Sequence, residues 1–356
     1  MRREAEGRGA AGLIPLVHLR TLAAAVAGGA VATWLGIPLG WMIGAMLGVA
    51  ALAWFTEVAA WEPVRAVSLL LLGLGLGQTF DGPVIAAVAA ALPAMLAGGV
   101  LTILAGVLLS RPFARMAKVD RRTGYFCTVP GGITVMAVLA QREGVPIAPV
   151  ALAQTIRMVL VVLVFPPLLA LAAPPVLDSV FQVPRPPFAA GGFVLLLAAA
   201  GLLALLGRRL GLANPWMLGA LTVTVALAAT IGMPSGVPSP LIDAAQVGLG
   251  MVLGQRLTKR FLLSAPRLMT ASVASMALLV AVLGVLAVPL ALAFGLPVAA
   301  VVLGLAPGGM PEMAITAKAL DLAVPLVLGF HLTRVVLCNL LVGPLWRLAV
   351  RLGWVT

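Results

Sequence analysis

The chain has 356 residues, of which 62% are hydrophobic and only 10% are charged. A water-soluble protein this apolar could not cover its surface, so the composition excludes a soluble globular domain and indicates a protein that sits in lipid. We interpret the net charge of +12 as cytosolic retention of short basic loops rather than as a nucleic-acid surface, because no basic helix lies outside the apolar segments.

Apolar segments follow one another along the whole chain. Residues 1–17 are basic and then apolar, and we interpret them as a cytosolic tail before the first span rather than as a cleaved signal peptide. Runs of about 17–25 residues, the length that spans a bilayer as a helix, then recur. They lie near residues 19–37, 39–55, 64–80, 83–109, 123–141 and 147–172 in the first half, and near 187–207, 214–232, 240–256, 268–294, 298–319 and 324–346 in the second.

The second half of the chain repeats the first. A shift of 177 residues (307 − 130) places Pro307-Gly308-Gly309 on Pro130-Gly131-Gly132, and the same shift places Arg334 on Arg157. Chance alignment of small apolar residues does not explain a matched Arg, so the sequence predicts an internal duplication. The predicted parts are the tail at 1–17, repeats at 18–173 and 187–350, a Pro-rich linker at 174–186 and a C-terminal tail at 351–356.

The charges of the loops predict how the two repeats are oriented. Residues 111–122 are basic, whereas their counterpart near 295–297 carries no charge. Conversely, the loop near 81–83 is not basic, whereas its counterpart at 256–267 is. If Lys and Arg stay in the cytosol, the repeats have opposite orientations, which requires an odd number of crossings in each. The predicted fold is an all-α polytopic membrane protein with two inverted repeats of about five spans each and both termini cytosolic.

Each repeat contains a helix breaker inside an apolar run, in VPGGITVMAVLAQ (129–141) and APGGMPEMAITAK (306–318). We predict that this segment is the one that fails to span, either as a re-entrant hairpin or as half of a broken helix. Broken backbone at membrane depth is tolerated only where protein buries it or where water and substrate reach it. The glycines at 73–80 and 248–257 are a second candidate for such a break, although we favour the interpretation that they pack helices.

The Pro-Gly-Gly elements are candidates for ligand binding. Pro130 and Pro307 suit the position just before a helix, and glycine lets a ligand approach the backbone closely. A helix that begins at Gly132 or Gly309 would present unpaired N–H groups and a positive dipole end. Two such ends from inverted repeats, meeting near the midplane, form a common site of secondary transporters. The alternative is that Pro-Gly-Gly only turns the chain at the surface.

Two arginines lie in the middle of the last apolar run of each repeat. Burying an unpaired Arg in hydrocarbon costs at least a few kcal/mol, so Arg157 and Arg334 should face protein or a polar cavity. Gln154 and His331 stand three positions earlier, on the same helical face. These four side chains either help to bind an anionic group or cap the carbonyls of the broken helices, and the sequence leaves both open.

Glu312 is the one carboxylate that follows either Pro-Gly-Gly element, since Val135 occupies the matching position. It could pair with Arg334 or carry a coupling proton, and Thr316 shares its helical face. No group of His, Cys, Asp and Glu has metal-ligand spacing, so we expect no metal and no cofactor. The predicted substrate-binding residues are Pro130, Gly131, Gly132, Gln154, Arg157, Pro307, Gly308, Gly309, Glu312, Thr316, His331 and Arg334.

The doubled PGG-x-x-x-M-A element, followed by an Arg-containing span, resembles the AbrB-duplication family of bacterial inner-membrane proteins over nearly the whole chain. The resemblance implies a location in the bacterial inner membrane and a fold similar to the inverted-repeat antiporter and bile-acid-symporter superfamily. The acidic residue that the family has before Met falls on Glu312 only, so the resemblance does not extend to a symmetric two-acid site. Family members are labelled AbrB-family regulators or ammonia monooxygenases, and the second label finds no support in these residues because the metal ligands are missing.

The leading hypothesis is a secondary transporter, not an enzyme, that carries a small and preferentially anionic solute through a midplane site. Its expected partners are the lipid bilayer and the solute, without nucleic acid, and small-residue pairs such as Gly98-Gly99 and Gly191-Gly192 permit a homodimer without requiring one. The alternative is a membrane-bound sensor that regulates gene expression indirectly through a partner. A membrane enzyme is the third and least favoured interpretation.

Overall fold

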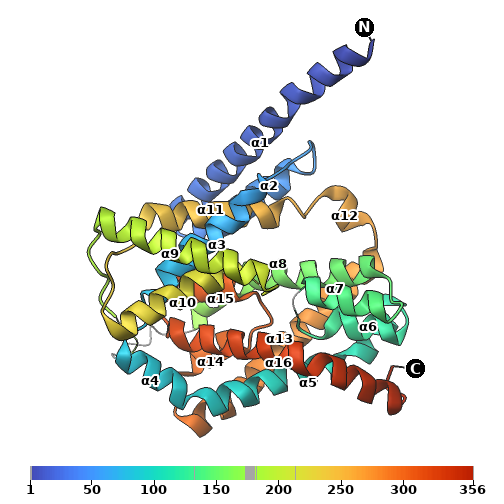
Figure 1. The fold of residues 1–356 in the computed structure, drawn as a ribbon. Helices are drawn as coiled ribbons and strands as arrows, with labels where there is room; N and C mark the ends of the chain where they lie inside the picture. Colours follow the sequence, from blue (N-terminus) through green and yellow to red (C-terminus); the bar gives the residue numbers. More distant parts are fainter. Residues whose placement is uncertain (1, 132, 173–180, 182, 213, 356) are drawn as a thin grey trace. The chain divides into compact units, whose positions relative to one another are not determined.

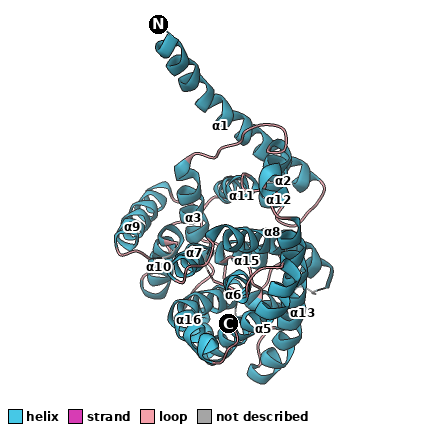
Figure 2. Ribbon diagram, turned by 90° about the vertical axis from the view of Figure 1, so that its right-hand side faces the viewer, coloured by secondary structure: helices cyan, strands magenta, loops and turns pink. Residues whose placement is uncertain are grey.

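The computed structural model describes residues 2–131, 133–172, 181, 183–212 and 214–355, with side chains described from residue 16 onward except at 133–135 and 172. Within these ranges the regular structure is helical (Figures 1 and 2). The helices are α1 (Arg2–Trp34), α2 (Gly40–Leu52), α3 (Glu62–Gly77), α4 (Gly82–Ala90), α5 (Leu92–Ala117), α6 (Arg121–Thr128), α7 (Ile133–Arg142), α8 (Ile147–Ala172), α9 (Ala190–Arg209), α10 (Pro215–Thr230), α11 (Ser239–Gly254), α12 (Lys259–Leu263), α13 (Pro266–Phe294), α14 (Val298–Leu305), α15 (Met310–Ala319) and α16 (Val324–Arg351).

Several helices are apolar enough to cross a membrane, as the composition predicts. Six described segments have both the length and the hydropathy that a membrane span requires, and three shorter apolar helices accompany them. The six are Leu16–Trp34, Leu92–Ala117, Ile147–Leu171, Ala190–Arg209, Pro266–Phe294 and Val324–Arg351. The chain is therefore a multi-pass protein of the membrane type.

The helices repeat with the same period as the residues. α3 begins at residue 62 and α11 at residue 239, a shift of 177 (239 − 62). The same shift relates both ends of α6 to those of α14, and both ends of α7 to those of α15. The predicted duplication therefore extends from matched residues to matched helix boundaries.

The compact units of the structure do not coincide with the two sequence repeats. Unit 1 consists of Met1–Asp81 and Val183–Phe261, and unit 2 of Gly82–Gln182 and Leu262–Thr356. Each predicted repeat, 18–173 or 187–350, is thus divided between the units, so that each unit takes matching parts of both repeats. Most of the predicted linker lies outside the described residues, since 174–180 and 182 belong to the part that the structure leaves undescribed.

In unit 1 the helices of the two repeats exchange partners. α2 of the first repeat packs on α11 of the second, and α10 of the second packs on α3 of the first. A Cβ at Gly73 would lie 2.7 Å from the carbonyl oxygen of Met217. A Cβ at Gly250 would overlap the carbonyl oxygen of Met42. The two contacts are equivalent, because 73 + 177 = 250 and 42 + 175 = 217. These glycines are helix-packing positions, which is the interpretation that we favoured from the sequence.

Two glutamines bind the irregular backbone that precedes α3 and α11. The Gln255 side-chain oxygen accepts a hydrogen bond from the Ala60 N–H at 2.8 Å, and the Gln78 oxygen accepts one from the Val237 N–H at 3.4 Å. Gln78 Nε2 also donates to the Ser235 carbonyl at 3.2 Å. Since 60 + 177 = 237, the glutamine of each repeat accepts from the equivalent backbone N–H of the other repeat. Lipid could not supply this acceptor.

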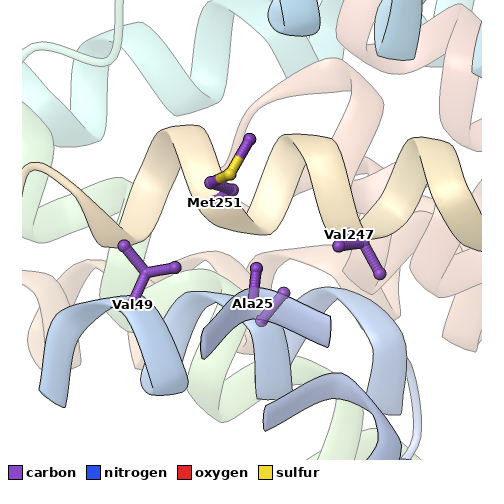
Figure 3. Packing of buried hydrophobic residues seen from close by; sticks show 5 residues of the cluster. Ala25, Val49, Val247 and Met251 are labelled. Carbon is purple, nitrogen blue, oxygen red and sulfur yellow. The ribbon is translucent and has the colours of Figure 1, made fainter. Parts of the chain in front are cut away.

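The core of unit 1 is built from small and branched side chains, as Figure 3 shows for residues of α1, α2 and α11. These residues are at most 7% exposed, and they bring α11 of the second repeat against α1 and α2 of the first. Their small volume lets the three helices approach closely, so the contacts are dispersion contacts between well-packed surfaces. The buried members are Ala25, Ala45, Val49, Val247 and Met251.

Unit 2 has the same exchange of partners around α5 and α13, which pack on each other. α16 of the second repeat packs on α5, and α8 of the first repeat packs on α13. Between the long helices lie two pairs of short helices, α6 with α7 and α14 with α15. α6 ends at Thr128 and α7 begins at Ile133, whereas α14 ends at Leu305 and α15 begins at Met310. The Pro-Gly-Gly elements occupy these two interruptions.

We expect Gly73→Ala to lower the free energy of unfolding by about 1–3 kcal/mol, the usual cost of overpacking. The new Cβ would meet the Met217 carbonyl oxygen at 2.7 Å and the Ala220 Cβ at 2.8 Å, and both are tied to backbone that cannot give way. Gly201→Ala in α9 is the matched control, because nothing lies within 4 Å of its Cβ. Thermal unfolding in lipid nanodiscs measures the difference, and equal behaviour of the two variants would contradict the packing role.

Candidate functional site

The second Pro-Gly-Gly element is held by two side chains of α16. Arg334 donates from Nη1 to the Ala306 carbonyl and from Nη2 to the Gly308 carbonyl, both at 2.6 Å. His331 Nε2 lies 3.1 Å from the Leu303 carbonyl oxygen. A carbonyl can only accept, so this contact places the imidazole proton on Nε2. The last carbonyls of a helix have no intrahelical donor, and these side chains supply it.

The first Pro-Gly-Gly element is held in the same way by α8. Gln154 Nε2 donates to the carbonyls of Phe126 at 2.9 Å and Val129 at 3.1 Å. Arg157 Nη2 donates to the Gly131 carbonyl at 3.1 Å. Adding 177 to the three acceptors yields 303, 306 and 308, the same carbonyls that His331 and Arg334 bind. We call Gln154, Arg157, His331 and Arg334 the clamp residues.

The clamp residues are all buried. Their hydrogen bonds show which of two roles from the sequence analysis, binding an anion or capping carbonyls, the arginines fulfil. The exposed fraction is 0% for Gln154 and His331, 8% for Arg157 and 7% for Arg334. Each donates to backbone carbonyls at the helix breaks, inside an apolar bundle. The arginines therefore cap carbonyls, and an additional role in binding an anion depends on the hydrogen-bonding capacity that remains.

That remaining capacity differs between the two arginines. Both Nη atoms of Arg334 are engaged by carbonyls. Among the described residues, Arg157 Nε and Nη1 have no hydrogen-bond partner. The same holds for Gln154 Oε1 and His331 Nδ1. A buried guanidinium with unused donors is costly in a low-dielectric environment, so Arg157 is the clamp residue that still needs a partner.

The beginning of α15 is shaped by Glu312, which is 3% exposed. Gly309 is the N-cap of this helix, and a Cβ added there would overlap the Glu312 carboxylate. A side chain at this position would displace the carboxylate, which folds back over the first turn toward the N-cap. A carboxylate at this place stabilises the positive end of the helix. The helix end that we predicted to attract an anion thus already faces one from the chain itself.

The other predicted residues of α15 and the loops are buried or undescribed. Thr316 is fully buried, and its hydroxyl donates to the Glu312 carbonyl at 2.8 Å, so its proton is used within the helix. Pro130 and Pro307 are buried in the interruptions before α7 and α15, where a residue without N–H leaves one fewer donor to satisfy. Gly132 lies outside the described residues, as does the side chain of Val135.

The structure adds two residues that the sequence did not single out. Cys338 Sγ on α16 donates to the Pro130 carbonyl at 2.8 Å. A Cβ at Gly308 would lie 2.7 Å from Val161 Cγ1 on α8. Since 161 + 177 = 338, each Pro-Gly-Gly element packs on the long helix of the other repeat at the same position. In the sequence, the shift of 177 that relates Val161 to Cys338 is the one signal of their equivalence. Val and Cys are chemically different, so no motif reveals it.

We expect Arg334→Ala to lower the free energy of unfolding by roughly 2–6 kcal/mol, because two buried carbonyls lose their donor at about 1–3 kcal/mol each. Arg157→Ala should cost half of this or less, because it removes one hydrogen bond and also removes a buried charge with unused donors. Arg347→Ala, at an exposed position of α16, is the control and should change stability by less than about 0.5 kcal/mol. Unfolding in mixed micelles measures the three variants, and an Arg157 variant as unstable as the Arg334 variant would contradict the assignment.

Comparison with known proteins places this geometry in a family. The model of the family described as transition state regulatory protein AbrB matches residues 41–350. Uncharacterized protein YhjN of Bacillus subtilis (strain 168) is 29% identical over 358 residues, which cover 94% of this chain and 93% of YhjN. Within the described residues, no three His, Cys, Asp or Glu side chains are grouped so that they could hold a metal ion. The matched range includes both Pro-Gly-Gly elements and all four clamp residues, and the chain belongs to the AbrB family.

Proposed function

We propose that the protein is a secondary transporter of a small anionic solute in the bacterial inner membrane, with its site at the two broken helices of unit 2. The observation that carries the proposal is the duplicated clamp: two interruptions at equivalent positions, both buried among long apolar helices and both satisfied by side chains of the last helix in each repeat. Interrupted helices of inverted repeats that converge at mid-membrane are the usual architecture of such sites.

The lengths of the short helices support half-membrane segments. α6 and α14 have 8 residues each, and α7 and α15 have 10. At a rise of about 1.5 Å per residue they extend about 12 Å and 15 Å, against a hydrocarbon thickness of about 30 Å. No single one of them can span. We propose that each pair is re-entrant. In the first repeat α1, α5 and α8 have the length of a full crossing, and we propose that the shorter apolar helices α2 and α3, of 13 and 16 residues, are the other two of five crossings.

An uninterrupted helix would satisfy its own backbone without help from other side chains. In this protein the breaks require four buried polar clamp residues, two of them arginines whose desolvation is costly. Such an arrangement is expected where irregular backbone lines a path for substrate. Glu312 is the buried carboxylate of this region, and we propose that it carries the coupling proton or takes part in ion pairing during transport.

Flux measured in proteoliposomes tests the transport proposal. Currents on a solid-supported membrane, recorded for a panel of small organic anions, should exceed those of empty liposomes for at least one solute. Glu312→Gln keeps the shape of the side chain and removes the titrating group, so we expect at least a tenfold lower flux. Asp321→Asn, at an exposed position just after α15, is the control and should keep the flux. An unchanged flux in Glu312→Gln would refute the role of this carboxylate.

Cysteine labelling tests the inverted orientation of the repeats. In a variant whose buried Cys127 and Cys338 are replaced, Arg122→Cys and Arg260→Cys should both react with an impermeant maleimide from the cytosolic side only, because basic loops stay inside. Phe294→Cys, next to the uncharged counterpart of the first basic loop, should react from the other side. Labelling of the first two positions from opposite sides would show parallel repeats instead.

A regulatory role is the second candidate, because the family model carries the description of a regulatory protein. In that case the same site would bind a ligand and pass the signal to a partner. The regulatory role predicts ligand binding without flux, together with a specific partner recovered by crosslinking in the native membrane. The flux assay separates it from transport.

A further inference from the structure

A small cavity lies beside Arg157 within unit 2. Its volume is about 20 Å³, enough for a small group of atoms rather than for a large solute. Four elements contribute to its wall: α5, α6, α8 and α13. Its lining residues with polar side chains are Thr128, Ser272, Ser275 and Arg157, together with the thiol-bearing Cys127. The cavity thus combines one buried cation with uncharged hydroxyls.

The hydrogen bonds show which of these groups can still donate. Thr128 donates to the Gly106 carbonyl at 2.8 Å, and Ser272 donates to the Leu268 carbonyl at 2.7 Å, so both protons are used. Arg157 keeps Nε and Nη1 without a partner among the described residues, although only 8% of its surface is exposed. Arg157 therefore needs an acceptor, and a negatively charged one satisfies both the donors and the charge.

The equivalent space in the second repeat is filled. Under the shift of 177, Ala153 corresponds to Phe330 and Thr128 to Leu305. A Cβ at Gly98, the counterpart of Ser275, would lie 2.9 Å from the Phe330 ring and 3.0 Å from Leu305. An aromatic ring and a leucine thus occupy the position where the first repeat has a methyl group and a hydroxyl.

In the second repeat the terminal donors of the arginine are also used. Arg334 corresponds to Arg157, and both of its Nη atoms bind carbonyls. Both repeats therefore have the clamp, but within the described residues only the first has an arginine with unused donors, Arg157, and a cavity beside it. A purely structural clamp would require neither the hydroxyl lining nor the small Ala153, so the difference indicates a ligand on the Arg157 side.

We propose that the Arg157 cavity binds the carboxylate group of a short monocarboxylic acid, and that the protein has one such site because Phe330 closes its counterpart. One guanidinium without a second cation in the lining matches a single negative charge, which favours a carboxylate over a dianionic phosphate. The inference rests on the proposed function in taking this acid as the transported solute. The binding itself does not depend on transport.

Binding is measured on the purified full-length protein in nanodiscs, with sodium formate, acetate and propionate added at constant ionic strength against sodium chloride. A ligand that binds the folded state raises the unfolding temperature with its concentration, so at least one of the acids should do so while chloride and inorganic phosphate do not. Arg157→Gln and Ala153→Phe should each weaken binding at least tenfold. Ala153→Phe copies the residue of the second repeat, where Gly98 leaves room for the ring. Because Ser275 stands at that position beside Ala153, the ligand-free unfolding temperature of this variant shows whether the ring is accommodated.

Two further variants keep the test independent of folding defects. Ser275→Ala removes one hydroxyl with little change in volume, and should weaken binding about threefold or more. Thr270→Val removes a hydroxyl from the same helix outside the cavity, where Thr270 bonds the Arg267 carbonyl, and should keep the affinity of the unmodified protein. Each variant is first compared in its ligand-free unfolding temperature.

The outcomes separate this inference from the proposed function. If the unmodified protein binds a carboxylate, both Arg157→Gln and Ala153→Phe lose this binding, and no flux is detected, the result supports the site and refutes the transport proposal. Flux that is unaffected by both substitutions would support transport and overturn the site. No stabilisation by any of the three acids, or stabilisation by phosphate in their place, would overturn the carboxylate assignment.

Discussion

The backbone carbonyls at the two helix interruptions impose the main constraint on unit 2. An apolar bundle offers them neither water nor lipid partners, and a carbonyl left unpaired there is costly. At each break the chain meets this requirement with two side chains that stand three residues apart on one face of a long helix. They are Gln154 with Arg157 on α8 and His331 with Arg334 on α16. These hydrogen bonds hold α8 and α16 against the two interruptions, and α13 and α5 pack on these helices in turn.

Reciprocal pairing is the second principle of the structure. Within each unit, helices of one repeat pack both on their own counterpart and on a different helix of the other repeat, and the second kind of contact recurs with the roles exchanged. Gln78 and Gln255 do this in unit 1, and Val161 and Cys338 do it in unit 2. Isologous interfaces between identical subunits follow the same rule. Here the duplication places such an interface within one chain, so neither repeat can complete its packing alone.

Duplication also allows the two halves of the site to diverge. Once both repeats carry a clamp, the fold tolerates different residues around it, since the carbonyl caps already satisfy the backbone. Under the shift of 177, Glu312 corresponds to Val135 and Phe330 corresponds to Ala153. The first difference places a carboxylate at only one helix start, and the second leaves space beside only one arginine. A symmetric scaffold thus holds an asymmetric set of chemical groups, which suits a single ligand.

Periodic and compositional features determined much of the protein before any coordinates: the apolar helices, the duplication with its shift of 177, the breaks at Pro-Gly-Gly, and the shared face of Gln154 with Arg157 and of His331 with Arg334. These are local properties, set by neighbours along the chain and by the helical repeat. Only the tertiary structure decided that the arginines cap carbonyls, that the glycines of α3 and α11 pack on α10 and α2, and that each compact unit draws on both repeats. Those outcomes depend on which surfaces that are distant in the sequence come into contact, and a sequence pattern does not encode such contacts directly.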